Sequence, residues 1–156
     1  MSGPLKEGMK APAFSLPADG GGKIALKDFA GRKVVLYFYP KDDTEACTKQ
    51  AVGFSAAAKT FERAGAAVIG VSKDSVASHD RFKAKHHLKI ALGSDEAGKA
   101  VEAYGVWVEK SMYGRKFMGV ERATFLIDGN GTICRIWRKV KVAGHVDEVL
   151  AAVKSL

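Results

Sequence analysis

The residue with the clearest chemical potential is Cys47, which stands where a strand is expected to end and a helix to begin. An apolar run over residues 33–39 leads into the polar segment 40–44. Thr44 is a favourable helix N-cap, and if it caps a helix, Cys47 is the third helical residue, beside N–H groups that lack intrahelical acceptors. These groups and the helix dipole stabilise an anion, so the sequence predicts a nucleophilic thiolate.

The spacing around this cysteine resembles a known family motif. Pro40, Thr44 and Cys47 follow the order proline, three residues, threonine, two residues, cysteine, which is similar to the peroxide-reducing motif of the peroxiredoxins. Further segments resemble this family in the same order along the chain, at residues 10–16, 37–44, 104–107 and 119–128. The resemblance is to the bacterioferritin-comigratory-protein, or peroxiredoxin Q, subfamily.

The resemblance implies a role for each matching residue. It implies that Cys47 is the peroxidatic nucleophile, that the Thr44 hydroxyl hydrogen-bonds the sulfur and the peroxide, and that the Pro40 ring shields the pocket from water. Arg122 lies in a segment similar to the one that carries the essential arginine, and a guanidinium offers a fixed fork of donors that cannot lose its proton. Gln50, one helical turn after Cys47, is expected to brace this arginine or the loop.

Plainer interpretations exist for these residues. A lone cysteine on an apolar helix stripe is commonly a small core residue, and an arginine that begins a strand is commonly a surface residue. The helix start and the family motif coincide at Cys47, which favours catalysis, with a thiol that is only partly exposed. The apolar stripe consists of Cys47, Ala51, Phe54, Ala58 and Phe61.

The main departure from the family pattern concerns the resolving cysteine. Many relatives carry it five residues after the first cysteine, where this chain has Val52, and others carry it on the helix that corresponds to residues 75–86, which has none here. Cys134 lies in a predicted strand and is expected to be structural rather than a resolver. The sequence therefore predicts a one-cysteine mechanism, in which thioredoxin, glutaredoxin or a low-molecular-weight thiol is the reductant.

The order of the predicted elements indicates an α/β fold. Strands and helices alternate first, and a hairpin and an amphipathic helix then close the chain. We expect a thioredoxin-like sandwich, with a central mixed β-sheet flanked by helices and an N-terminal β-hairpin. The predicted strands cover residues 34–39, 66–71, 104–108, 123–127 and 132–137, the helices begin near 45, 75, 96 and 146, and the N-terminal hairpin turns at 18–23.

Composition limits the remaining possibilities. The 156 residues are 47% hydrophobic, which suits a single domain over residues 1–156. We expect a cytoplasmic protein, because no run is long enough to span a membrane, residues 1–16 lack the apolar run of a signal peptide, and two distant cysteines form no disulfide framework. The net charge of +8 is dispersed, so specific nucleic-acid binding is not expected. A monomer or weak dimer is expected.

The predicted function is a thiol peroxidase that reduces hydrogen peroxide or organic hydroperoxides through a cysteine sulfenic acid, without a metal or organic cofactor. The four histidines show no metal-binding pattern and are expected on solvated helix faces. Thiol–disulfide exchange would need a Cys-x-x-Cys pair, and Thr44 stands where its first cysteine would be. A redox-sensing or binding protein on a thioredoxin-like fold is the alternative, which peroxide turnover with excess thiol distinguishes.

Overall fold

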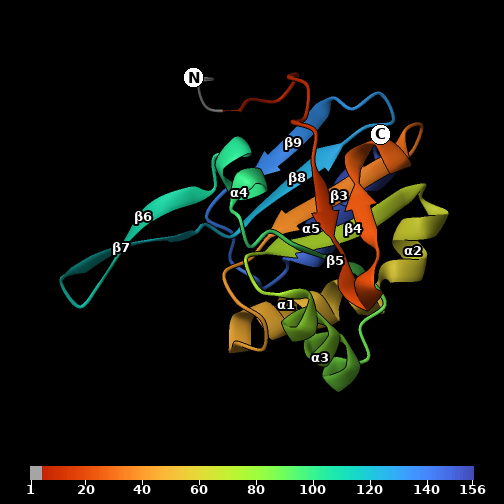
Figure 1. The fold of residues 1–156 in the computed structure, drawn as a ribbon. Coiled ribbons are helices and arrows are strands. Elements are labelled where there is room, and N and C mark those ends of the chain that lie inside the picture. The colour runs from red at the N-terminus through yellow and green to blue at the C-terminus, as the bar shows by residue number, and fades with distance from the viewer. Residues whose placement is uncertain (1–4) are drawn as a thin grey trace.

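The computed structural model describes residues 5–156, and its centre is a five-stranded mixed sheet (Figure 1). Three adjacent strands pair parallel with one another, and a fourth strand pairs antiparallel with the middle strand of the five on one side and with the edge strand on its other side. The predicted α/β sandwich with a mixed central sheet and an N-terminal hairpin is confirmed. In spatial order the strands are β5 (Ala91–Ser94), β4 (Ala66–Ser72), β3 (Lys33–Phe38), β8 (Ala123–Ile127) and β9 (Ile133–Trp137).

Both faces of the sheet are covered. One face packs against four helices, α1 (Glu45–Ala56), α2 (Ala58–Arg63), α3 (Val76–His86) and α5 (His145–Lys154). The other face packs against the β1–β2 hairpin and one short helix. These covering elements are β1 (Ser15–Pro17), β2 (Lys23–Ala25), α4 (Lys99–Ala103), and two 3-10 turns, η1 (Asp19–Gly21) and η2 (Leu26–Phe29).

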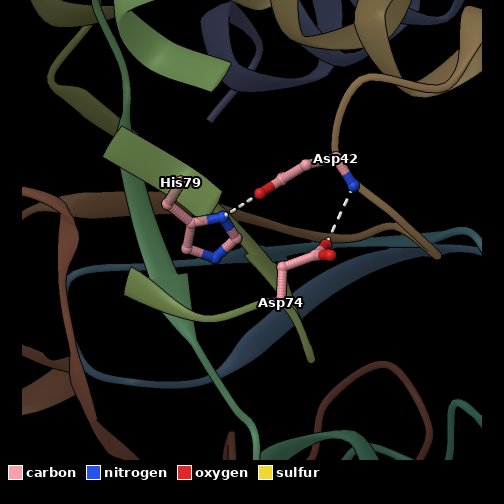
Figure 2. A group of neighbouring side chains, drawn as sticks. All are labelled: Asp42, Asp74 and His79. Atoms are coloured by element: carbon pink, nitrogen blue, oxygen red, sulfur yellow. Dashed lines mark hydrogen bonds and ion pairs between the residues drawn. The ribbon is translucent and has the colours of Figure 1, made fainter. Parts of the chain in front are cut away.

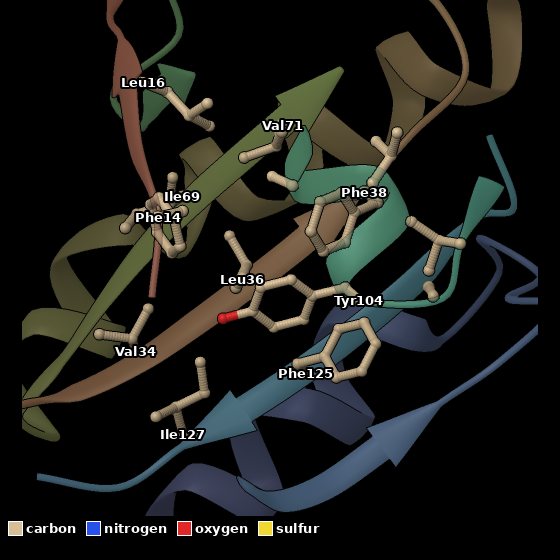
Figure 3. Packing of buried hydrophobic residues seen from close by; sticks show 14 of the residues in the cluster. Phe14, Leu16, Val34, Leu36, Phe38, Ile69, Val71, Tyr104, Phe125 and Ile127 are labelled. Carbon is tan, nitrogen blue, oxygen red and sulfur yellow. The ribbon is translucent and has the colours of Figure 1, made fainter. Parts of the chain in front are cut away.

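The central strand β3 is buried on both faces, as its continuous apolar run predicts. Val34, Leu36 and Phe38 point to the side covered by the hairpin and α4, where they pack as Figure 3 shows. The alternate residues Val35 and Tyr37 belong to the cluster under the helices. Because β3 supports both layers, the loop that leaves its carboxyl end starts from a rigid base.

Several predicted boundaries differ from the structure. The helix that carries the apolar stripe is interrupted at Ala57, although Cys47 and Phe61 are both buried. The predicted helix from residue 96 starts only at Lys99, because Gly98 before it has a positive φ of 79°. The predicted strand at 104–108 starts only at Trp107, and β5 was not predicted.

A second hairpin, also not predicted, forms a ribbon outside the main sheet. Its strands β6 (Trp107–Met112) and β7 (Arg115–Val120) pair with each other only, and the ribbon projects from the body of the molecule (Figure 1). Tyr113 and Gly114 form the turn, with φ of 52° and 78°. Positive φ at both positions is typical of a type I′ turn, but Tyr-Gly lacks the asparagine or aspartate that usually marks this turn in a sequence.

No helix within residues 5–156 is long and apolar enough to cross a membrane. Residues 1–4 lie outside the described residues. They belong to the predicted domain and to the segment 1–16 in which a signal peptide was not expected.

Replacement of Gly70 by alanine is expected to test the packing of β3 against β4. A Cβ at Gly70 would lie 2.7 Å from Tyr37 Cζ and 2.8 Å from its hydroxyl. The overpacking should lower the free energy of unfolding by about 1–3 kcal/mol in urea titrations. Gly22→Ala is the control, because a Cβ there meets no atom within 4 Å. Equal effects of the two changes would contradict the packing described.

Candidate active site

Cys47 occupies the helix position that the sequence predicts. It is the third residue of α1, and Thr44 is the N-cap with an extended backbone at φ −85° and ψ 158°. The Cys47 side chain is 1% exposed and packs in the core cluster under the helices. The prediction of a partly exposed thiol is therefore wrong, because the first turn of α1 already lies against the sheet.

Arg122 binds the sulfur directly. Its Nη2 lies 3.2 Å from Cys47 Sγ, and its Nη1 donates to Gln50 Oε1 at 2.6 Å. Gln50 is fully buried, and its Nε2 has no hydrogen-bond partner among the described residues. Two donors of one guanidinium therefore join residues that stand one helical turn apart on α1, as expected for a fixed fork.

The antiparallel pairing of β3 and β8 explains how Arg122 reaches α1. Phe38 at the end of β3 pairs with Ala123 at the start of β8, so Arg122 stands beside the loop that precedes α1. The Arg122 carbonyl accepts from Val140 N at 3.0 Å, which holds its backbone. Sheet register therefore brings together residues that are 75 positions apart in the sequence.

Glu121 adds a second anchor for the arginine. Its N–H donates to Val106 O at 2.7 Å, and its carboxylate accepts from Arg138 Nε at 3.0 Å and Nη2 at 3.2 Å. Burial alone would raise the pKa of Glu121, but the hydrogen bonds from Arg138 and Lys139 N and the charges of these two residues together outweigh it and lower the pKa. This pair was not predicted from the sequence, where the only signal is an acidic residue directly before Arg122.

The remaining predicted site residues lie on the loop. The Thr44 hydroxyl donates to Lys41 O at 3.0 Å, and no hydrogen bond joins Thr44 to Cys47 within residues 5–156. Thr44 is exposed and Pro40 is half-buried. The structure thus joins Cys47, Arg122 and Gln50 by hydrogen bonds. Thr44 and Pro40 are related to Cys47 by their closeness in the sequence.

The loop is anchored by a buried carboxylate that was not predicted from the sequence. Asp42 Oδ1 accepts from the Tyr39 hydroxyl at 2.6 Å, and Oδ2 accepts from the Ser78 hydroxyl at 2.8 Å and lies 2.7 Å from His79 Nδ1. Asp42 N donates to Asp74 Oδ2 at 2.9 Å (Figure 2). The active-site loop is therefore tied both to α3 and to the end of β4.

His79 is doubly protonated in this arrangement. Its Nδ1 faces the Asp42 carboxylate, and its Nε2 lies 3.0 Å from Gly93 O, so both neighbours are acceptors. Burial alone would lower the pKa of His79, but the hydrogen bond and charge of Asp42 outweigh it and raise the pKa. Burial alone would raise the pKa of Asp42, but the hydrogen bonds from His79 and Tyr39 lower it. The two form a buried ion pair.

Asp42, Asp74 and His79 are also close enough to hold a metal ion, since their ligand atoms lie within 4.8 Å of one another (Figure 2). We interpret the group as a hydrogen-bonded network instead. Both nitrogens of His79 carry protons in this arrangement, and Asp74 Oδ2 accepts from the Ser72 hydroxyl at 2.6 Å in addition to Asp42 N. A metal-free protein stays a prediction.

The expectation that the histidines are solvated is wrong for two of them. His79 is fully buried, and His145 is 4% exposed and lies 2.8 Å from the Thr124 hydroxyl through Nε2. Burial lowers the pKa of His145. Each stands near the start of a helix that packs on the sheet, and the polar residues around it in the sequence conceal the burial.

A second aspartate strengthens the attachment of the active-site loop to α3. Asp43 accepts from Lys85 Nζ at 2.7 Å and from His86 Nε2 at 2.9 Å, although it is exposed. The hydrogen bonds of His86 and Lys85 lower the pKa of Asp43. Both aspartates of the loop therefore bind α3, one in the core and one at the surface.

Cys134 lies toward the other end of the sheet. Val34 at the start of β3 pairs with Ile127, which pairs with Ile133, whereas Cys47 follows the far end of β3. Val34 and Phe38 are four residue steps apart along the strand, about 13 Å, whereas a disulfide needs Cα atoms within about 7 Å. Both thiols are free, and Cys134 Sγ donates weakly to Thr132 O at 3.7 Å. This geometry supports the prediction that Cys134 is not a resolver.

The fold and the site together define a class. A buried thiol at the start of the helix after the central strand, bound by an arginine that directly precedes a neighbouring strand, is the arrangement of a thiol-dependent peroxidase on a thioredoxin-like fold. The chain belongs to the AhpC/TSA family, whose model matches residues 8–136. It is a peroxiredoxin of the bacterioferritin-comigratory-protein, or Q, type.

Similar proteins support this assignment. Peroxiredoxin Bcp of Bacillus subtilis is 45% identical over 152 residues, which cover 97% of each chain. The structure of Xanthomonas campestris peroxiredoxin Q has a TM-score of 0.87 at 46% identity and covers 91% of this chain and 90% of its own. The structure of a mutant of Xylella fastidiosa PrxQ has a TM-score of 0.93 at 37% identity and covers 99% of this chain and 98% of its own.

The Asp42–His79 pair predicts how stability depends on pH. The lowered pKa of Asp42 contributes stability above the unfolded carboxyl pKa of about 3.9, and this is lost as pH falls through the folded value. The raised pKa of His79 contributes stability below the unfolded imidazole pKa of about 6.5, and this is lost as pH rises through the folded value. Both contributions to stability are complete between about pH 3.9 and pH 6.5.

Urea titrations across pH check this with matched variants. His79→Asn should lower the free energy of unfolding by about 3 kcal/mol near pH 6 and flatten the alkaline decline, because it leaves Asp42 without its cation. His87→Asn, at an exposed position, should leave the pH profile unchanged. An unaltered alkaline decline in His79→Asn would show that this ion pair is not its source.

Proposed function

We propose that this thiol-dependent peroxidase reduces hydrogen peroxide and organic hydroperoxides with Cys47 as the nucleophile. The observation that carries the proposal is the hydrogen bond from Arg122 to Cys47 Sγ at 3.2 Å. A cation that donates to a buried sulfur favours the thiolate over the thiol. The same fork can stabilise negative charge that develops on a peroxide oxygen beside the sulfur.

The chemical step is a displacement at oxygen. Cys47 thiolate attacks one oxygen of the hydroperoxide, an S–O bond forms, and the O–O bond breaks with its electron pair going to the leaving oxygen. That oxygen takes up a proton and departs as water or an alcohol, which leaves Cys47 as sulfenic acid. In this proposal Thr44 Oγ1 accepts a hydrogen bond from the peroxide while its own O–H donates to Lys41 O, and the Pro40 ring excludes water.

Organic hydroperoxides are proposed alongside hydrogen peroxide because of one relative. The bacterioferritin comigratory protein of Xanthomonas campestris has alkyl peroxide reduction activity, and its structure is 46% identical to this chain with a TM-score of 0.87. The mainly apolar environment of Cys47 suits an alkyl group next to the reacting oxygens.

The proposed catalytic cycle uses one cysteine. Both thiols are free, and Cys134 lies toward the opposite end of the sheet, so an external thiol must reduce the sulfenic acid. We propose thioredoxin, glutaredoxin or a small thiol as the reductant, a cytoplasmic location that suits free thiols, and a single domain over residues 1–156 acting as a monomer or weak dimer.

Cys47→Ser should abolish peroxide consumption, because a serine hydroxyl is not ionised at neutral pH. Stopped-flow measurement of peroxide loss with excess dithiothreitol checks this. Circular dichroism controls for the fold. A variant that keeps most of the activity would remove Cys47 from the proposed role and leave the redox-sensing or binding alternative.

Arg122→Lys keeps the charge but loses the fork that joins Cys47 and Gln50. The second-order rate of Cys47 oxidation should fall about 100-fold, as when one charge-stabilising donor is removed from an active site. Arg81→Lys at an exposed position of α3 is the matched control and should react as the wild type does. Equal rates of Cys47 oxidation in both variants would exclude Arg122 from the proposed catalytic role.

The one-cysteine cycle predicts the products that follow peroxide treatment. Wild type and Cys134→Ser should both show sulfenic acid at Cys47 by intact mass, then sulfinic acid when the thiol is scarce, with equal turnover. A disulfide between Cys47 and Cys134 that forms as fast as turnover would make Cys134 the resolver and refute the proposed cycle.

A further inference from the structure

The β6–β7 ribbon carries an unusual share of the exposed apolar surface. Every residue from 111 to 118 is exposed. Four of the seven large hydrophobic side chains that are exposed among the described residues belong to this hairpin: Met112, Tyr113, Phe117 and Met118, at 58%, 98%, 44% and 49%. An isolated two-stranded ribbon gains little stability by itself, so this apolar surface is unfavourable unless it binds something.

Strand register divides the ribbon into two faces. Directly paired residues share a face, and successive pairs alternate between the faces. The cationic face consists of Val108, Lys110, Met112, Arg115, Phe117 and Gly119. The opposite face consists of Trp107, Glu109, Ser111, Lys116, Met118 and Val120.

The two faces differ in what already binds them. On the opposite face Val120 is buried, Lys73 Nζ lies 4.1 Å from the centroid of the Trp107 ring, and Lys116 lies 3.9 Å from Glu109. The cationic face has no acidic residue to neutralise Lys110 and Arg115. It therefore combines unbalanced positive charge with exposed apolar side chains.

The ribbon begins beside the active site. β7 ends at Val120, two residues before Arg122, whose guanidinium binds Cys47. Lys110 packs over Gly119, where a Cβ would lie 3.2 Å from Lys110 Cδ. Burial and the Arg122 charge lower the pKa of Lys110, and the charges of Cys47 and Glu121 oppose this, so its ammonium is within electrostatic reach of the site.

Charge selects the kind of partner. A second copy of this chain would bring another surface of a protein with net charge +8 against these cations. An acidic surface would instead be attracted to the ribbon, and its apolar residues could bury Phe117 and Met112.

Access to the sulfur indicates why such a partner needs a docking surface. Cys47 is 1% exposed, so a protein thiol reaches it only when the first turn of α1 opens. Binding to the neighbouring ribbon supplies free energy that offsets this opening.

We propose that the cationic face of the β6–β7 ribbon is the docking surface for the reductant, a thioredoxin-type dithiol protein with an acidic surface around its thiols. The proposal rests on the one-cysteine peroxidase function proposed above. The docked thiolate attacks the Cys47 sulfenic acid, an S–S bond forms, the S–O bond breaks, and the hydroxyl leaves as water after taking up a proton. The partner's second thiol then displaces Cys47 thiolate, and the partner leaves as the disulfide.

Matched substitutions on the two faces test the proposal. Arg115→Glu and Phe117→Ser change the cationic face, and Lys116→Glu and Met118→Ser make the same kinds of change on the opposite face. Peroxide turnover is measured with thioredoxin and, separately, with dithiothreitol. The two cationic-face variants should lose about tenfold or more in kcat/KM for thioredoxin, a loss of about 1.4 kcal/mol, and keep dithiothreitol turnover. The two controls should change less than twofold in both assays.

The assays separate this proposal from the function on which it depends. No turnover with dithiothreitol in the wild type would overturn the peroxidase function and the docking proposal together. Normal dithiothreitol turnover with equal thioredoxin kinetics in all four variants would overturn the docking surface alone, as would equal losses on both faces. Raising the salt concentration should weaken the thioredoxin reaction of the wild type and have a smaller effect on Arg115→Glu.

Discussion

The site depends on one constraint, the attachment of the loop between β3 and α1 to helix α3. A loop that leaves a buried strand and must start a helix within six residues has few contacts of its own. The buried ion pair of Asp42 and His79 supplies the fixed point. Any loop conformation that separated Asp42 from His79 would leave an uncompensated buried charge. The loop therefore has a strongly favoured conformation, and Cys47 has a defined place.

The second requirement is that a cation arrives from a distant part of the chain. Antiparallel pairing of β8 with β3 places Arg122 at the same end of the sheet as the start of α1. The Glu121–Arg138 ion pair and the backbone bond to Val140 keep it there. The thiol is thus held from one side by a helix start and from the other by an arginine, in a core that excludes most water.

The same topology separates the two cysteines and isolates the ribbon. The register that brings Arg122 to Cys47 also carries Cys134 toward the far end of the sheet. The chain between α4 and β8 forms a ribbon outside the sheet, so its side chains are available to another molecule beside the site. One arrangement therefore has two consequences. The catalytic cycle needs an external thiol, and a projecting surface lies next to Cys47.

The sequence by itself determined the local features. The helix start at Cys47, the doubly buried strand β3, the hairpin around residues 128–131 and the family membership all follow from short-range patterns and motif order. Arg122 was identified through the resemblance, since nothing local joins it to Cys47, whereas Gln50 was expected to brace it from a position one helical turn after Cys47.

Only the tertiary structure decided the rest, because burial and protonation depend on residues far apart in the chain. His79 has polar neighbours in the sequence, yet it is a buried cation because α3 packs against Asp42 and Gly93. The thiol is more buried than its helix stripe suggests because the first turn of α1 rests on the sheet. The β6–β7 ribbon depends on a Tyr-Gly turn with two positive φ angles, which no local preference of tyrosine predicts.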